Sequence, residues 1–227
     1  MRTALVTGAT RGLGAETARR LAEAGYTVYV GARGERAGAR TVPLDVTCED
    51  SVRAAAELVR ECTGRLDVLV NNAGIAGPAR PAAEVTAHDL LTVYDTNVFG
   101  PVRVVRAFLP LLEAGEAPVV VNVSSGLGSI AAAADPAARA ADVPDWIPAL
   151  SYGSSKAALN MITAQYAHAC PHIRFNAVDP GLTATGFNGH AGSRTVAEGA
   201  DIIVRLATIG ADGPTGGYFS ATGPLPW

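Results

Sequence analysis

The sequence is poor in lysine and in charge. Of its 18 basic residues, 17 are arginine and only Lys156 is a lysine. Charged residues make up 17% of the chain and hydrophobic residues 48%. This composition excludes an intrinsically disordered protein, because disorder needs low hydrophobicity and high net charge. The net charge of -3 gives no basic footprint for nucleic acid, so we expect no nucleic-acid partner.

Long apolar runs are absent and cysteines are few. No run reaches the roughly 18 residues of a transmembrane helix, so we expect no membrane partner. The N-terminal MRTALVTGAT leads directly into a strand-like run and a glycine turn, unlike a signal peptide. Cys48, Cys62 and Cys170 lie far apart without a CxxC pair, which argues against disulfides or a zinc site and fits a reducing compartment. We therefore expect a cytoplasmic protein without a metal.

Strand-like and helix-like segments alternate along the chain. Short apolar runs predict strands, and apolar residues at helical spacing predict helices. The predicted strands are 4–7, 27–32, 41–46, 66–74 (running into a loop), 118–125, 172–180 and 217–220. The predicted helices are 12–24, 51–62, 86–113 with a bend near Gly100 and Pro101, 150–169 and 196–208. Capping boxes are predicted at Thr47 with Asp50, Thr86 with Asp89, and Thr195 with Glu198.

This alternation predicts an α/β fold with a single domain over residues 1–227. Strands that are apolar on both faces indicate a parallel sheet with helices on both faces. Right-handed connections make it a Rossmann-type doubly wound sheet, whose ligands bind beyond the carboxyl ends of the strands. The segment of about 126–149 is too long for an ordinary loop, so we interpret it as an insertion near the active-site mouth, with one short helix around 136–141.

A glycine-rich turn directly follows the first predicted strand. Residues 7–14 read TGATRGLG, and a predicted helix follows. Glycine permits a sharp turn without a Cβ that would obstruct a phosphate, and the N–H groups of a helix N-terminus attract a pyrophosphate. Strand, turn and helix in this order predict a dinucleotide site. Its candidate residues are Gly8, Thr10, Arg11, Gly12, Leu13 and Gly14.

The end of the second predicted strand indicates which dinucleotide binds. NAD sites of this kind place a carboxylate there, on the ribose hydroxyls. Here the strand ends at Arg33, and no acid follows until Glu35. Arg33, together with Arg11 in the glycine turn, can make charge-assisted contacts with a 2′-phosphate. Two cations without an acid favour NADP(H), and the alternative is that both arginines are solvated at the surface.

Tyr152 and Lys156 are four residues apart in a predicted helix. Residues i and i+4 share one helix face, so the phenol and the ammonium face the same space. The pKa of a free tyrosine is about 10, and a neighbouring cation lowers it toward a range useful for catalysis. The only lysine of the chain stands here, which favours this role over an incidental surface pair.

Three further polar residues are candidates for the same site. Ser124 and Ser125 end the predicted strand 118–125, where a hydroxyl can hydrogen-bond to the developing negative charge of a reacting carbonyl. Asn97 lies inside a predicted helix, although asparagine competes there for backbone groups. We interpret Asn97 as a buried polar side chain that holds a water near the lysine.

Together these motifs resemble the classical short-chain dehydrogenase/reductase family, above all its carbonyl-reductase-like branch. The family pattern TGxxxGxG matches at 7–14, NNAG at 71–74, and a proline–glycine pair at 180–181. The resemblance implies the catalytic set Asn97, Ser125, Tyr152 and Lys156. Ser125 is preferred to Ser124 because the family has a glycine three residues later, here Gly128. The resemblance also implies cofactor contacts from Asp45, Val46, Asn72, Ala73, Gly74, Tyr152, Lys156, Pro180, Gly181 and Thr185.

The resemblance implies an NADPH-dependent carbonyl reductase that converts a small ketone or aldehyde to an alcohol, reversibly. Tyr152 would be the general acid and Ser125 would polarise the substrate oxygen. Lys156 would lower the pKa of Tyr152 and hold the ribose, while Asn97 keeps a proton-relay water in place. The alternatives are an NAD-linked alcohol dehydrogenase, an epimerase or dehydratase on the same fold, a non-catalytic NADP-binding regulator, and a purely structural protein.

Some features depart from the family pattern or stay without a role. Ser125 and Tyr152 are 27 residues apart, which is longer than usual and similar to monomeric carbonyl reductases. A monomer is therefore expected, and otherwise a homo-oligomer. Asp179, directly before Pro180, is not the residue that the pattern predicts. Candidates for the substrate pocket are Leu127, Trp146, Ile147, Phe187, His190 and Trp227.

Overall fold

The computed structural model describes residues 2–34 and 40–227. Its strands are β1 (Thr3–Thr7), β2 (Thr27–Ala32), β3 (Arg40–Pro43), β4 (Val68–Asn71), β5 (Val119–Val123), β6 (Arg174–Val178), β7 (Gly217–Ser220) and β8 (Gly223–Pro224). They form one sheet in the order β3-β2-β1-β4-β5-β6-β7-β8. The chain reverses its direction of growth between β1 and β4, as a doubly wound Rossmann-type sheet does. The predicted fold class is therefore confirmed.

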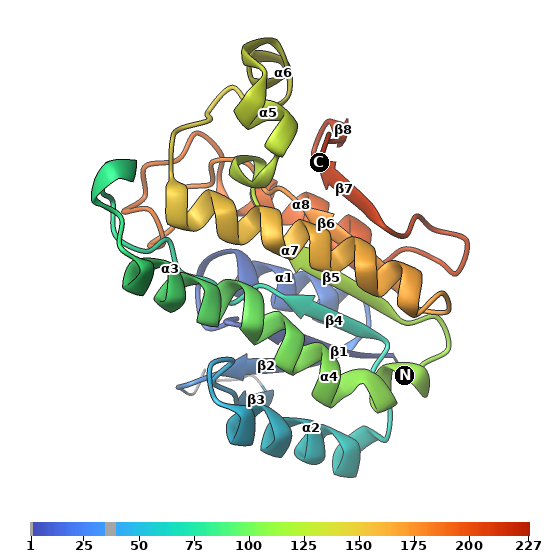
Figure 1. Cartoon of the computed structure of the whole chain (residues 1–227). Coiled ribbons are helices and arrows are strands. Elements are labelled where there is room, and N and C mark those ends of the chain that lie inside the picture. Colours follow the sequence, from blue (N-terminus) through green and yellow to red (C-terminus); the bar gives the residue numbers. More distant parts are fainter. Residues whose placement is uncertain (1, 35–39) are drawn as a thin grey trace.

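The helices of the described residues are α1 (Gly12–Glu23), α2 (Glu49–Thr63), α3 (Ala87–Tyr94), α4 (Gly100–Glu113), α5 (Ile130–Ala134), α6 (Pro136–Asp142), α7 (Leu150–Ala169) and α8 (Val196–Ala207). Figure 1 shows α2, α4 and α7 in front of the sheet and α1 and α8 behind it. No helix within residues 2–34 and 40–227 combines the length and the apolar character needed to cross a bilayer.

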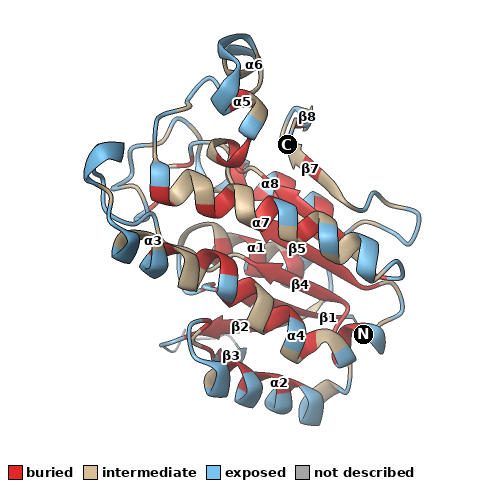
Figure 2. Cartoon of the chain, viewed as in Figure 1, coloured by how far each residue is buried: buried red, intermediate tan, exposed pale blue. Residues whose placement is uncertain are grey.

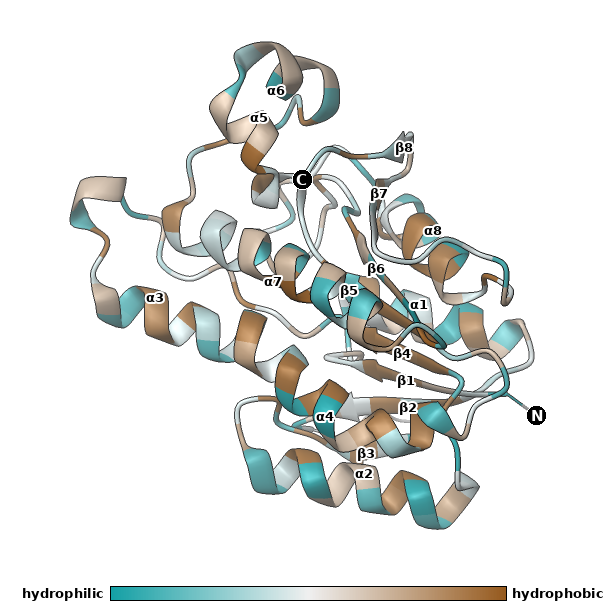
Figure 3. Cartoon of the chain, turned by 45° about the vertical axis from the view of Figure 1, so that its right-hand side comes forward, coloured by the Kyte–Doolittle hydropathy of each residue, from teal (hydrophilic) through white to brown (hydrophobic). Residues whose placement is uncertain are grey.

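Two hydrophobic clusters fill the spaces between the sheet and its helix layers. Successive strand residues point to opposite faces, so Leu5 of β1 packs into the cluster under α2 and α4, whereas Ala4 and Val6 pack into the one under α1 and α8. Figure 2 shows the resulting run of buried strands. In Figure 3 the covering helix α2 carries both hydrophobic and hydrophilic segments, as an amphipathic helix does.

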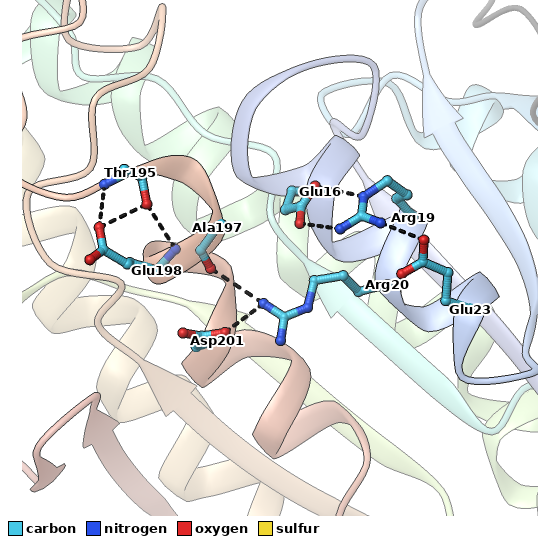
Figure 4. A network of polar contacts seen from close by, with 8 residues as sticks. All are labelled: Glu16, Arg19, Arg20, Glu23, Thr195, Ala197, Glu198 and Asp201. Atoms are coloured by element: carbon cyan, nitrogen blue, oxygen red, sulfur yellow. Dashed lines mark hydrogen bonds and ion pairs between the residues drawn. The ribbon is translucent and has the colours of Figure 1, made fainter.

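Polar contacts join α1 to α8 behind the sheet (Figure 4). Arg20 of α1 donates to the carboxylate of Asp201 at 2.6 Å. The predicted capping box at Thr195 and Glu198 is present at the start of α8, as is the one at Thr86 and Asp89 at the start of α3. Exposed ion pairs contribute little to stability, about 1 kcal/mol at most, so the apolar packing between the two helices dominates.

The third predicted capping box, Thr47 with Asp50, is wrong. Helix α2 begins at Glu49, and its N-cap Cys48 makes no side-chain capping bond. The Thr47 hydroxyl instead donates to Asp45 at 2.7 Å, and Asp50 pairs with Arg53. Because Cys48 is the N-cap, Thr47 lies one residue too early in the chain to cap this helix.

The predicted long helix is interrupted where the bend was expected. Residues Asp95–Phe99 form a π-helical turn between α3 and α4, directly before Gly100 and Pro101. Pro101 is tolerated in the first turn of α4, where its missing N–H costs nothing. Such π-turns are frequent at functional sites, and this one contains Asn97.

The insertion contains more structure than predicted. Helix α6 (Pro136–Asp142) is the expected short helix, but α5 precedes it, because Ser129 caps an alanine run that has no apolar periodicity to reveal it. The insertion also binds the C-terminal tail, since Ala131 N donates to Trp227 O at 2.9 Å. The short strand β8, which runs antiparallel to β7, was likewise missed. Strands β4, β5 and β6 are shorter than predicted, because the residues after them form the loops at the carboxyl edge of the sheet.

Candidate active site

The carboxyl ends of four central strands place the motif residues along one edge of the sheet. Gly8 follows β1, Asn72 follows β4, Ser125 lies two residues after β5, and Asp179 follows β6. The strands are parallel and adjacent, so these residues meet at the edge where doubly wound sheets bind their ligands.

The glycine turn after β1 passes very close to the loop after β4. Gly8 has a φ of +64°, and a Cβ built on it would lie 2.9 Å from the Cα of Ala73. Thr7 joins the two segments, because its hydroxyl oxygen accepts from the backbone N–H groups of Asn72 and Ala73 at 3.0 Å each. The Asn72 side chain donates back to Thr7 O at 2.8 Å. Thr7 is thus a positioning residue. It is the first residue of the glycine motif, but the motif alone predicted no role for it.

We expect Gly8→Ala to weaken both folding and dinucleotide binding. The left-handed backbone costs a residue with a Cβ about 1 to 2 kcal/mol, and the contact with Ala73 adds about 1 to 3 kcal/mol. Gly64→Ala is the matched control, because Gly64 has a φ of +67° and open space around its Cβ position. In urea unfolding, Gly8→Ala should have a much lower free energy of unfolding than Gly64→Ala. Equal losses of stability in the two variants would contradict the close approach of Gly8 to Ala73.

The first turn of α1 has the features of a pyrophosphate site. The N-cap Arg11 makes no side-chain capping bond to this turn. Gly12 has a φ of +56° and faces Thr185, whose Cγ2 lies 3.5 Å from the Cβ position of Gly12. Leu13 packs toward α8, where a Cβ at Gly199 would approach it. These residues fit a nicotinamide dinucleotide, because the N-terminus of α1 and the glycine backbone before it face the same space.

The two arginines predicted to favour NADP lie at the end of β2, for Arg33, and at the N-cap of α1, for Arg11. Arg33 follows that strand and is exposed, as is Arg11. The pKa of Asp45 is lowered, mainly by the hydrogen bonds from Thr47 and also by the charge of Arg33. Arg33 therefore lies near Asp45, on the side where an adenosine ribose would be held. Glu35, the first acid after Arg33, lies outside the described residues.

Tyr152 and Ser125 meet on the α7 side of the site. Tyr152 lies in the first turn of α7, and its phenol faces the Ser125 side chain. The pKa of Tyr152 is raised, first by burial, then by the carboxylate of Asp179, and only partly offset by Ser125. Lys156 Nζ lies 5.5 Å from the Tyr152 ring centroid, and its charge does not outweigh burial. The lowering of the Tyr152 pKa by Lys156 stays a prediction.

Lys156 is buried beneath the site. Its Nζ donates to the backbone oxygen of Val123 at 2.7 Å, and burial lowers its pKa to about 8. Nζ also lies 3.8 Å from the Cβ position of Gly74, in the loop after β4. A cation held at this depth faces the space between that loop and Tyr152.

The two serines after β5 have different surroundings. Ser124 is buried, and its hydroxyl donates to the side chain of Asn160 at 2.6 Å. Ser125 faces Tyr152, and its backbone oxygen accepts from the hydroxyl of Tyr218 at 2.5 Å. Of these two serine hydroxyls, that of Ser124 is therefore engaged inside the protein, whereas that of Ser125 faces Tyr152.

Asn97 is buried and ties the loop after β4 to α7. Its Nδ2 donates to Ile75 O at 2.9 Å and to the Ser155 hydroxyl at 3.0 Å. Its Oδ1 accepts from Ile75 N at 2.9 Å and lies 3.3 Å from the Cβ position of Gly74. The predicted burial of Asn97 is confirmed, and its polar atoms hold this loop beside Lys156.

Three side chains join the site without a role in the sequence reasoning. Phe187 was only a pocket candidate, and its ring centroid lies 5.7 Å from that of Tyr152. Tyr218 holds the Ser125 carbonyl, and its ring stacks on Trp227. The Asp179 carboxylate lies beside Gly126, the residue after Ser125. Asp179 carried a signal in the sequence as a departure from the family pattern and Phe187 as a pocket candidate, whereas Tyr218 carried none.

Comparison with known proteins gives consistent matches. The family model for short chain dehydrogenase matches residues 2–195. A short-chain dehydrogenase from Penicillium roqueforti is 37% identical over 91% of this chain and 88% of its own length. The (+)-neomenthol dehydrogenase of Arabidopsis thaliana is 32% identical over 96% of each chain. The structure of NADPH-bound carbonyl reductase from chicken fatty liver is similar, with a TM-score of 0.84 and 29% identity over 100% of this chain and 99% of that one.

Proposed function

The chain belongs to the short-chain dehydrogenase family and is an oxidoreductase, and from this premise we propose that it is an NADPH-dependent carbonyl reductase. It reduces a small ketone or aldehyde to an alcohol, and the reaction is reversible. The observation that carries the proposal is the meeting of Ser125 and Tyr152 above the buried ammonium of Lys156. The similar proteins whose names state a carbonyl reductase or a neomenthol dehydrogenase support the substrate class.

Each catalytic residue has a role that its surroundings support. Tyr152 holds a proton on its hydroxyl oxygen and donates it to the substrate oxygen as general acid. Ser125 donates a hydrogen bond that polarises the same oxygen. Lys156 binds ribose hydroxyls from the space next to Gly74, and Asn97 keeps that loop and a relay water in place. When bound, NADPH supplies the hydride.

The insertion shapes the mouth of this site. Gly128, at its start, lies against the backbone of Lys156, and Leu127 O lies 2.9 Å from the Cβ position of Gly153. Ser129 donates to Pro226 O at 2.9 Å, so the C-terminal tail lies against the same segment. We expect the insertion and Phe187 to border the substrate and to leave the cofactor site unchanged.

The test of this function is turnover. Purified protein is assayed with NADPH and with NADH over a panel of ketones and aldehydes, by loss of reduced-nicotinamide absorbance. Reduction that is faster with NADPH is the expected result. Faster turnover with NADH would replace the proposal by an NAD-linked dehydrogenase. Tight NADPH binding without turnover over the whole panel would indicate a binding regulator instead.

We expect Arg33→Ala to remove the preference for NADPH over NADH. A charge-assisted contact to the 2′-phosphate contributes about 1.5 to 3 kcal/mol, which is about a 10- to 100-fold change in Kd. NADH lacks this phosphate, so its Kd should not change. Fluorescence titration of both cofactors measures the effect. Arg53→Ala, an exposed arginine of α2, is the control, and an equal loss for NADPH and NADH in Arg33→Ala would refute the phosphate contact.

A further inference from the structure

Tyr218 reaches the Ser125 turn from a strand near the edge of the sheet. It lies in β7, where it pairs with Ala177 of β6. Successive strand residues point to opposite faces, so Phe219 packs into the cluster under α1 and α8, whereas Tyr218 points to the other face. There its hydroxyl donates to the backbone oxygen of Ser125 at 2.5 Å. The two residues are 93 positions apart in the chain, so only the assembled sheet brings them together.

The Ser125 backbone oxygen has two hydrogen-bond donors. One is inside its own turn, because Gly128 N donates to it at 2.8 Å across the 3₁₀ turn Gly126–Gly128. The other is the Tyr218 hydroxyl, which comes from outside the turn. In the same turn Leu127 N donates to the Ser125 side chain at 3.3 Å. The inner bonds set the shape of the turn, and the bond from Tyr218 fixes where the turn lies on the sheet.

The Tyr218 ring is held by buried and stacked neighbours. Tyr218 is 2% exposed and packs with Ala177 and Leu225 in a small buried cluster. Leu225 N also donates to Tyr218 O at 2.8 Å. The Trp227 ring stacks on the Tyr218 ring at a centroid distance of 5.5 Å. Close packing of this kind holds a side chain in one conformation, so the hydroxyl is presented to Ser125 at a fixed place.

The residues that pack on Tyr218 are themselves bound to the insertion. Ser129 donates to Pro226 O at 2.9 Å, and Ala131 N donates to Trp227 O at 2.9 Å. These bonds keep Trp227 in place on the Tyr218 ring. The start of the insertion and the segment after β7 are thus joined at several points, of which the hydroxyl of Tyr218 is the one that touches Ser125.

We propose that Tyr218 is a positioning residue of the reaction, because its hydroxyl holds the Ser125 backbone and thereby places the Ser125 hydroxyl against the substrate oxygen. The inference rests on the proposed function, in which Ser125 polarises that oxygen. A hydrogen-bond donor aimed at a developing charge is effective only in a narrow range of positions. A displacement of about 1 Å can lower the rate by about 10²-fold.

The first test is a double-mutant cycle of Tyr218→Phe and Ser125→Ala. Tyr218→Phe removes one hydroxyl and keeps the ring, so it should lower kcat by about 10-fold and leave the Kd for NADPH unchanged. Ser125→Ala should lower kcat by about 10²- to 10³-fold. Adding Tyr218→Phe to Ser125→Ala should then change kcat by no more than about twofold, because no Ser125 hydroxyl is left to place. An equal loss in both backgrounds, or no loss in either, would overturn the proposal.

The matched control is Tyr29→Phe. Tyr29 is another buried strand tyrosine, 4% exposed, and it packs in the cluster under α2 and α4. The same chemical change there should leave kcat within a factor of about two. If Tyr218→Phe does not fold, Trp227→Ala takes its place, because Trp227 is 41% exposed and its ring steadies that of Tyr218. Trp227→Ala should lower kcat only where the Ser125 hydroxyl is present, and a loss that persists in Ser125→Ala would contradict the proposal.

A readout without turnover distinguishes this inference from the proposed function. Hydrogen exchange of the Leu127 and Gly128 amides is followed by NMR in the wild type, Tyr218→Phe and Tyr29→Phe. Both amides donate to Ser125, so in Tyr218→Phe they should exchange about fivefold faster, and in Tyr29→Phe at the wild-type rate. Unchanged exchange in Tyr218→Phe would overturn the inference. Absence of carbonyl reduction by the wild type would overturn the proposed function, while the exchange rates still decide whether Tyr218 holds Ser125.

Discussion

Replacing Tyr152 by phenylalanine is expected to lower kcat for carbonyl reduction by about 10²- to 10⁴-fold while NADPH still binds. The change removes one oxygen, which is the proton donor in the proposed reaction. The ring stays, with its contact to Phe187 and its place in the first turn of α7. Cofactor binding relies mainly on the glycine turn and Lys156, so the Kd for NADPH should change little.

The control for this prediction is Tyr166→Phe. Tyr166 lies further along α7 and stacks on Phe175 at a centroid distance of 5.3 Å, away from Ser125. The same chemical change there should leave kcat within a factor of about two. Steady-state kinetics with fluorescence titration of NADPH measures both variants. Retained turnover in Tyr152→Phe would refute the assignment of the general acid.

Replacing Lys156 by methionine is expected to abolish most turnover and, unusually, to stabilise the free protein near pH 7. The ammonium is buried and its pKa is lowered from 10.5 to about 8. Keeping it charged below pH 8 therefore costs the folded state up to about 3 kcal/mol relative to the unfolded chain. Methionine removes that cost and keeps the apolar stem, but it loses the hydrogen bond to Val123 O, which contributes about 1 kcal/mol. A net gain of about 1 to 2 kcal/mol remains.

The sign of the pH dependence follows from the same shift. The unfolded chain holds the proton of this lysine up to about pH 10.5, whereas the folded protein loses it from about pH 8. Between these values the unfolded state binds more protons, so stability contributed by this group rises with pH. The advantage of Lys156→Met over the wild type should thus be largest below pH 8 and shrink toward pH 10.5.

Urea unfolding at several pH values and kcat with NADPH measure the two effects of Lys156→Met. Gln165→Met, at an exposed position of the same helix, is the control and should change neither. The expected combination is lower turnover with higher stability below pH 8, a trade-off typical of a functional site. A less stable variant at pH 7 would show that Lys156 stabilises the fold and would refute the cost assigned to its burial.

Local chemistry made much of this molecule predictable. The apolar runs and helical segments fixed the order of elements, and parallel strands with helical connections leave few arrangements other than the doubly wound sheet. The glycine turn needs only its own backbone conformation, and Tyr152 and Lys156 share a helix face because they are four residues apart. The capping box at Thr86 was also local, and it is present. The box at Thr47 failed because helix α2 starts at Glu49, so that Cys48 and not Thr47 is its N-cap.

The fold class, the strand edge that carries the site and the family therefore follow from the sequence, because each motif behind them is a short local pattern. The contacts between side chains across the site come from the assembled fold. Asn97 reaches Ile75 and Ser155, and Tyr218 reaches Ser125 over 93 residues. The raised pKa of Tyr152 belongs to this second group, because burial and the charge of Asp179 come from the assembled sheet edge and from no local pattern.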